Sequence, residues 1–392
     1  MPGGAPPPPG PGGYGGPGTP PPFYPPPPGG MGLPGMPPPP PKRGNTGLII
    51  GLIGGGLVVV IAIAVVVFVV VSAGGKKPEE KLKAAAVSLG GSRALALKGD
   101  FGGGADTLQG ELTVTKGGRT TGEVTWNSDQ VTLISADGKL YVKADAAYWK
   151  RQISGTEPPY YLGSGAQWGR LSADKLDLDF KAELTPEALA TKLRQAALAK
   201  VKPVETTLQG TKVLKFTTIS ATLYISDSDD AKLLRYESGS PKVTVDVTAK
   251  STSEASASIS DLRGRIGELK DSFDGSARPT TVDWKKGGCN GDSGCTVEAK
   301  IRPPFGAETP LTIDVRFSLT AGTMTGRDLG NCTTRITVSS STPVWASCRV
   351  TSSAWSSWAK ATGGTYYKHV DYKVIGATDS DVQGLLSGLD SE

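Results

Sequence analysis

A run of 24 consecutive uncharged and almost wholly apolar residues, 48–71, is the feature that most constrains what this chain can fold into. Nearly all of them are Val, Ile, Leu, Gly or Ala. A helix of that length spans roughly 36 Å at about 1.5 Å per residue, and the hydrocarbon core of a bilayer is about 30 Å thick. The run therefore predicts one transmembrane helix over residues 47–72, which would make the chain a single-pass membrane protein.

Residues 1–46, before the run, have a composition that cannot build a core. Residues 1–41 hold 20 of the chain's 31 prolines and no charged side chain. Proline lacks the donor that helices and central strands need, and glycine raises the entropy of the unfolded chain. We expect a disordered arm with polyproline II stretches. The Pro-Pro-Phe-Tyr motif at 21–24 resembles a peptide ligand of aromatic grooves, so the arm is either a solvated tail or a binding segment for a cytoplasmic partner.

All four cysteines, Cys289, Cys295, Cys332 and Cys348, lie in the last third of the chain. An even number without C-x-x-C spacing, in a chain with one histidine, predicts two disulfides rather than zinc. Disulfides persist in oxidising compartments. We therefore expect a cytoplasmic N-terminus and extracytoplasmic C-terminal domains at a bacterial cell membrane. The lysines that follow the apolar run predict the opposite orientation, and a cleaved signal peptide is a further alternative.

Residues 73–250 combine period-two alternation with two helical segments. Pro78 and the acidic residue after it begin a short helix over about 79–88. Alternating segments follow as far as residue 142, separated by turn residues such as Asp137-Gly138. Thr185 and Pro186 then begin a second helix that runs to about residue 201, and further strands continue to residue 249. This order predicts an antiparallel meander whose curved sheet carries helices on one side.

The segment 137–149, Asp-Gly-Lys-Leu-Tyr-Val-Lys-Ala-Asp-Ala-Ala-Tyr-Trp, together with 221–227 and 232–236, resembles the LolA/LprG-like lipoprotein-carrier family. The resemblance covers about 170 of the 392 residues. It implies an antiparallel half-barrel that closes over helices around a hydrophobic cavity for acyl chains. Many such carriers are anchored through a lipidated cysteine, which this chain lacks, and that departure favours presenting or sensing a lipid over shuttling it.

If the resemblance holds, inward residues of alternate strands and of the second helix line a ligand pocket. These residues are Leu112, Val114, Val124, Trp126, Leu140, Val142, Leu189 and Leu193. The same alternation is typical of a filled core. The sequence leaves both interpretations open.

Apolar residues at 259, 262, 266, 269 and 273 predict a helical connector over residues 251–276. Residues 277–378 alternate as short strands throughout, which predicts an all-β, immunoglobulin-like sandwich, and residues 379–392 remain as a C-terminal tail. We expect one disulfide between Cys289 and Cys295 and another between Cys332 and Cys348, because the members of each pair are close in sequence.

Three tryptophans in the sandwich, Trp345, Trp355 and Trp358, can either fill its core or stack on a sugar. In an extended strand Trp355 and Trp358, three residues apart, would point to opposite faces. Sugar binding and core filling are therefore both open interpretations of these three tryptophans.

Patterns that carry catalytic chemistry are missing from the sequence. One histidine cannot form a metal cluster, and there is no G-x-S-x-G motif. The acidic run at 227–230 has no glycine at the sixth position of a calcium loop. A net charge of +5 is modest and scattered. We therefore expect no enzyme activity, no cofactor, no metal and no nucleic-acid partner.

Together these features predict an α+β fold class: a disordered arm, one transmembrane helix, a half-barrel with helices and then a β-sandwich. The expected function is binding of a lipid or other hydrophobic ligand, including an acylated one, by a membrane-anchored extracytoplasmic half-barrel. The alternative is a structural or signalling interaction protein, in which the arm recruits a cytoplasmic partner and the two C-terminal domains contact envelope proteins or glycans. The oligomeric state is left open.

Overall fold

The computed structural model describes residues 76–103, 107–153, 159–289, 291–304, 310–339, 341–361 and 364–392. All of them belong to the second of the two units into which the chain divides, Ile63–Glu392. The expected arm (1–46) and the expected transmembrane helix (47–72) lie outside the described residues.

The expected fold class needs correction. Among the described residues, no helix combines the length and apolarity needed to cross a bilayer, so the structure gives no support to a transmembrane helix. Strands predominate over helices, in one sheet of twelve strands and two sheets of three. Strands predominate because apolar and polar residues alternate with a period of two through both domains. The described helices are short, and the longest, Thr252–Gly267, has sixteen residues.

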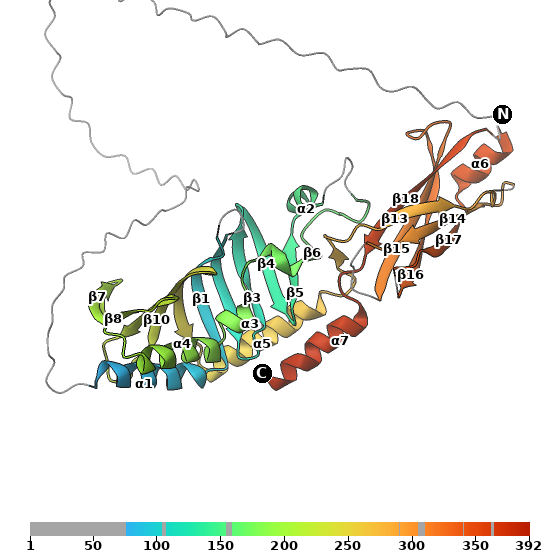
Figure 1. Cartoon of the computed structure of the whole chain (residues 1–392). Helices are drawn as coiled ribbons and strands as arrows, with labels where there is room; N and C mark the ends of the chain where they lie inside the picture. The colour runs from blue at the N-terminus through green and yellow to red at the C-terminus, as the bar shows by residue number, and fades with distance from the viewer. Residues whose placement is uncertain are drawn as a thin grey trace, which may run out of the picture. The chain divides into compact units, whose positions relative to one another are not determined.

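The twelve-stranded sheet consists of two antiparallel meanders that meet at its centre (Figure 1). Its order is β12-β6-β5-β4-β3-β2-β1-β11-β10-β9-β8-β7. The central pair joins distant parts of the sequence, with Leu97 of β1 opposite Val247 of β11. Among the described strands of this sheet, only β12 and β6 pair in parallel. The strands are β1 (Ala94–Phe101), β2 (Leu108–Thr115), β3 (Thr120–Trp126), β4 (Asp129–Ala136), β5 (Lys139–Ala144), β6 (Gln167–Leu171), β7 (Val204–Leu208), β8 (Thr211–Thr217), β9 (Ala221–Ser226), β10 (Leu233–Gly239), β11 (Lys242–Ala249) and β12 (Phe273–Asp274).

One face of this sheet, here called the inner face, is covered by α1 (Pro78–Gly90) and α4 (Pro186–Leu198). Both helices begin with proline at the first helical position, where its missing N–H costs nothing. The hydroxyl of Thr185 caps α4 by accepting from the Ala188 N–H at 3.2 Å. Three shorter helices lie elsewhere in this region: α2 (Ala146–Gln152), η1 (Ala173–Lys175) and α3 (Phe180–Glu183).

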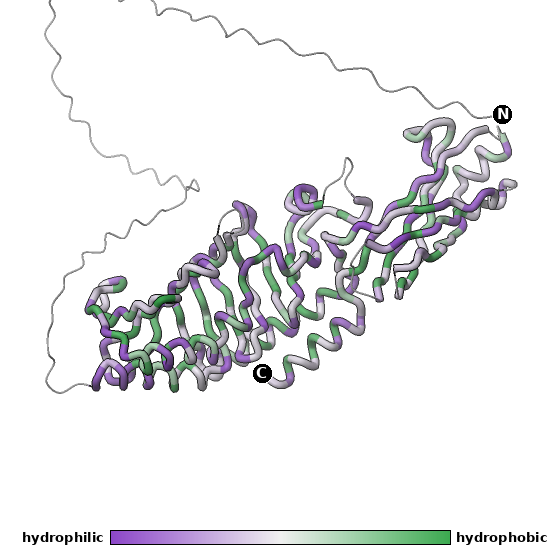
Figure 2. The backbone as a smooth tube through the Cα atoms, viewed as in Figure 1, coloured by the Kyte–Doolittle hydropathy of each residue, from purple (hydrophilic) through white to green (hydrophobic). Residues whose placement is uncertain are grey.

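The opposite, outer face carries α5 (Thr252–Gly267) and α7 (Asp379–Gly388), which lie side by side (Figure 1). They bury residues such as Ile134 and Tyr141, which point away from the inner face. Residues 379–392, left as a tail by the sequence analysis, thus form α7 and η2 (Leu389–Ser391) and join a core. In Figure 2 hydrophobic and hydrophilic residues alternate along the strands between these two layers.

The C-terminal domain contains two antiparallel three-stranded sheets, β13-β14-β17 and β16-β15-β18. Buried side chains of both sheets share one core. The strands are β13 (Thr280–Trp284), β14 (Cys295–Arg302), β15 (Leu311–Ala321), β16 (Asp328–Val338), β17 (Val344–Val350) and β18 (Tyr366–Val374). The expected all-β, immunoglobulin-like arrangement is wrong in detail, because only six strands are described and α6 (Ser353–Ala361) separates the last two.

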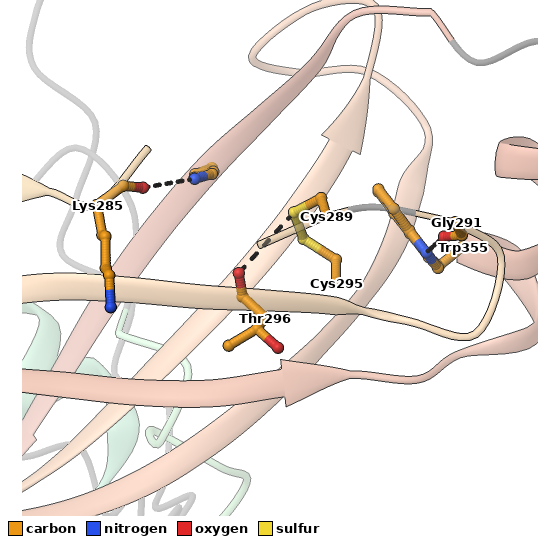
Figure 3. The surroundings of a disulfide bond; sticks show 7 residues. Lys285, Cys289, Gly291, Cys295, Thr296 and Trp355 are labelled. Atoms are coloured by element: carbon orange, nitrogen blue, oxygen red, sulfur yellow. Dashed lines mark hydrogen bonds between the residues drawn. A yellow bond between two sulfur atoms is a disulfide. The ribbon is translucent and has the colours of Figure 1, made fainter. Parts of the chain in front are cut away.

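The helix α6 also corrects the expected placing of two tryptophans. In a strand Trp355 and Trp358 would point apart, but three-residue spacing on a helix places them on one face. Their ring centroids are 5.2 Å apart, and both rings pack against Tyr366. The Trp355 indole is buried and its N–H donates to the Gly291 carbonyl oxygen at 3.2 Å (Figure 3).

Both predicted disulfides are confirmed. Cys289 and Cys295 close a glycine-rich loop beside Thr296 (Figure 3). Cys332 on β16 and Cys348 on β17 join an edge strand of one sheet to an edge strand of the other. The second bond therefore links the two layers of the domain.

Candidate functional site

The eight residues predicted to line a pocket all lie on the inner face of the large sheet or on α4. Their exposed fractions are 3% or less, and they belong to one continuous apolar core. Leu112 and Val114 come from β2, Val124 and Trp126 from β3, Leu140 and Val142 from β5, and Leu189 and Leu193 from α4. The structure thus brings all eight together, and of the three hollows considered below only one touches this set, through Leu140.

One hollow lined by several apolar residues lies at the C-terminal end of α4, next to the β8–β9 hairpin, and is here called the α4 hollow. Its volume is about 590 Å³ and it is partly open to solvent. Apolar side chains of Ala196, Ala199, Val201, Ile219, Ala221 and Leu223 line it, together with the polar residues Lys192, Gln195, Thr217, Thr218 and Ser220. Ala196 and Leu223 also belong to the core of the inner face, so the α4 hollow adjoins that core.

Local backbone geometry sets the two walls of the α4 hollow. The helix α4 ends because Lys200 adopts a positive φ of 49°, and the N–H of Val201 returns to the carbonyl of Ala196 at 3.2 Å. On the other wall Thr218 closes the hairpin: its N–H donates to the Ala221 carbonyl at 2.8 Å, and its hydroxyl accepts from the Ala221 N–H at 3.0 Å. Hydrogen bonds within each segment, made by the backbone and by the Thr218 hydroxyl, therefore hold the two walls in place.

Lys192 supplies a positive charge at the edge of the α4 hollow. Its Nζ donates to Glu183 Oε2 at 2.9 Å and lies 5.7 Å from the centroid of the Tyr236 ring. Burial is the largest influence and lowers the pKa of Lys192, but the hydrogen bond to Glu183 and the interaction with Tyr236 raise it, and the resulting pKa is above its ordinary value. The ammonium group therefore stays charged beside an apolar opening.

A second hollow lies where the β2–β3 and β4–β5 turns meet η1 and α3. Its volume is about 390 Å³. Leu140, Leu176, Leu178, Phe180 and Ala173 form its apolar part, but Lys139, Lys181 and three aspartates, at 137, 177 and 179, also line it. This balance of charges favours a solvated cleft over an apolar ligand site.

A third hollow lies on the outer face, between α5 and the strands β2 and β3, with a volume of about 570 Å³. Most of its lining residues carry charged or hydroxyl side chains. Glu111 and Glu123 lie directly opposite each other on the two strands, and Arg265 is held by Asp261 at 2.7 Å. No group of three or more His, Cys, Asp or Glu side chains suited to a metal was found in the part of the chain that the structure describes.

Of the three tryptophans considered for a sugar platform, Trp355 is fully buried and Trp358 packs against it. Trp345 on β17 is 44% exposed, opposite Lys300 on β14. The structure therefore does not gather the three indoles on one surface.

The sequence analysis missed Lys192 and Ile219 as residues of the α4 hollow. A signal for Ile219 was present: it lies between two predicted strands, where Gly, Asn, Asp, Ser or Pro is the usual turn residue. Nothing comparable marks Lys192, because a lysine on an amphipathic helix is ordinarily a solvated residue.

Searches with this sequence and structure matched no protein family, no curated protein and no solved structure.

Proposed function

We propose that this protein binds a molecule with a long apolar chain, such as a lipid, and that the α4 hollow holds that chain. The observation that carries the proposal is a partly open hollow of about 590 Å³ whose lining continues the apolar core of the inner face. Small-molecule sites are typically concave, mostly apolar and about 300–1,000 Å³ in volume.

The lining of the α4 hollow suits an amphipathic ligand. Three of its apolar residues are alanines, at 196, 199 and 221, and their short side chains leave space between α4 and the hairpin. The charged Lys192, which is paired with Glu183, and the hydroxyl group of Thr217 lie at the same opening, where the Thr218 hydroxyl is already hydrogen-bonded to Ala221. A chain inside the hollow would thus leave a polar headgroup next to donors, which is the arrangement that fixes the orientation of a ligand.

The proposal is tested by binding of a polyene long-chain fatty acid whose fluorescence rises in apolar surroundings. The full-length chain, purified in detergent, is titrated as wild type and as Ala199→Trp. Ala199 is exposed at the opening, so an indole there should block the hollow without entering the core. We expect the affinity to fall by at least about tenfold.

The matched control is Ala147→Trp, which places the same indole at an exposed position of another helix, α2. It should bind like the wild type. Native mass spectrometry of the wild-type chain should also show retained lipid. Equal binding by the two variants and the wild type, or no uptake of the probe by any of them, would refute the proposal.

We also propose that the described part of the chain works in an oxidising, extracytoplasmic compartment. The two disulfides support this location, since reducing compartments keep thiols reduced. A cysteine introduced at the exposed Ser88 of α1 tests it. Labelling by a membrane-impermeant thiol reagent is expected in intact cells, and labelling only after lysis would contradict the proposal.

A further inference from the structure

The tip of the β8–β9 hairpin presents an isoleucine where turns usually carry small polar residues. Ile219 is 109% exposed, as much as in an open peptide. Its neighbours Thr218 and Ala221 are tied to each other by hydrogen bonds, so the turn holds this side chain out in solvent. The fold does not bury this side chain, and an exposed apolar group becomes informative where others lie near it.

A second large exposed apolar side chain lies at the end of α4. Leu198 is 78% exposed. Its neighbour Ala199 lines the α4 hollow together with Ile219, so the helix end and the hairpin tip are the two sides of one opening. We call Leu198, Ile219, Lys200 and Lys202 the rim of the α4 hollow.

Lys200 and Lys202 give the rim itself a positive charge, whereas Lys192 and Arg194 are paired with Glu183 and Glu187, and the exposed Glu205 follows close by in the sequence. The hairpin residues 217–222 carry no charge. Lys200 and Lys202 are exposed. Exposed aliphatic residues beside lysines are the combination that binds an anionic bilayer, where the apolar groups enter the acyl boundary and the lysines meet headgroup phosphates.

We propose that the rim docks on an anionic lipid surface, so that the α4 hollow opens toward the bilayer. This inference rests on the proposed function, because docking would place the opening of the α4 hollow where the apolar chains of lipids enter and leave it. Charge complementarity favours a lipid surface over a protein partner. A protein partner would instead need a contiguous apolar face, and within residues 189–222 the exposed large aliphatic side chains are Leu198, Ile219 and, at 42%, Val204.

The test uses a cysteine introduced at Ser220, next to Ile219, as the attachment site for an environment-sensitive fluorophore. The described cysteines are all in disulfides, so the new thiol is the one labelled. The labelled full-length chain is mixed with vesicles of phosphatidylcholine alone or with about a third of phosphatidylglycerol. We expect a blue shift and increased emission with the anionic vesicles.

The control label is attached at Ser260→Cys, an exposed position on α5 at the outer face. Its emission should not change with vesicles, even if another part of the chain binds the membrane. Ile219→Ser should weaken the Ser220 response about tenfold in lipid concentration. Lys200→Gln with Lys202→Gln should weaken it about 20-fold for anionic vesicles.

Uptake of the fatty-acid probe without vesicles, measured on the Lys200→Gln and Lys202→Gln double variant, whose changed residues do not line the α4 hollow, separates the two proposals. Unchanged uptake with a lost vesicle response is expected if the rim only docks. A Ser220 response that is absent, or equal to that at Ser260, would overturn the docking proposal while leaving the ligand site standing. Response in phosphatidylcholine equal to that in anionic vesicles would also overturn it.

Discussion

Arg170 and Asp274 form a buried ion pair at one end of the large sheet. The Arg170 Nε–H donates to Asp274 Oδ2 at 2.9 Å, and the two side chains are 19% and 1% exposed. The other carboxylate oxygen accepts from the N–H groups of Ser276 and Ala277 at 2.8 and 3.0 Å. The pair therefore fixes β12 against β6 and sets the course of the chain toward β13.

Replacing Asp274 by alanine should be strongly destabilising. The change leaves the Arg170 guanidinium mostly buried without its carboxylate, and breaking a buried pair in this way costs about 3–5 kcal/mol. Urea unfolding of the full chain, followed by circular dichroism, measures the change in unfolding free energy. Asp261→Ala, which breaks the exposed pair with Arg265, is the control and should change it little. Equal midpoints for the two variants would contradict this account.

The alternation of apolar residues was enough to predict most strands of the large sheet and which side chains face inward. Leu112 and Val114 are examples, since they lie two apart and share the inner core. The second buried face could not be predicted in the same way. Ile134 and Tyr141 are buried by α5 and α7, far away in the sequence, and nothing local in β4 or β5 indicates which residues will cover them.

The candidate site was harder to predict than the fold. A lining side chain and a core side chain are both apolar and alternate identically, so the eight predicted residues could be placed on the inner face but not assigned to a cavity. The α4 hollow depends instead on where a helix ends and how short the side chains are there. The Trp355–Trp358 pair shows the same limit, because three-residue spacing has opposite meanings in a strand and a helix.

Two glycine substitutions should have effects of opposite sign. A Cβ at Gly169 would lie 2.6 Å from an atom of the Trp149 ring and 2.7 Å from one of Phe273, so Gly169→Ala should destabilise the chain by about 1–3 kcal/mol through overpacking. At Gly264, inside α5, a Cβ would meet nothing within 4 Å. There alanine should stabilise by about 1 kcal/mol through helix propensity. Thermal unfolding of both variants measures this, and a shift of the same sign in both would count against it.

The two disulfides should contribute unequally. Cys332 and Cys348 are 16 residues apart and Cys289 and Cys295 only 6. In the chain-entropy account, a disulfide that closes a longer loop adds more to the free energy of unfolding, about 3 kcal/mol for a loop of fifteen residues. Cys332→Ala with Cys348→Ala should therefore lower the urea midpoint of the C-terminal domain more than the double alanine variant of the other pair. Tryptophan emission from that domain follows its unfolding, and the reverse order would show that strain or loop packing dominates.

Acid should weaken the docking of α7 through Asp381. Burial is the largest influence and raises the pKa of this carboxyl, but hydrogen bonds from Lys139 and from Thr378 lower it further, to about 2 from an ordinary 3.8. Because the folded-state pKa lies below the unfolded one, the stabilisation is present above about pH 4 and is lost as the pH falls toward 2. Urea midpoints measured across this range should fall less steeply for Asp381→Asn, and also for Lys139→Met, which removes the 2.7 Å donor. Identical pH dependence in the wild type and both variants would show that Asp381 titrates at its ordinary pKa.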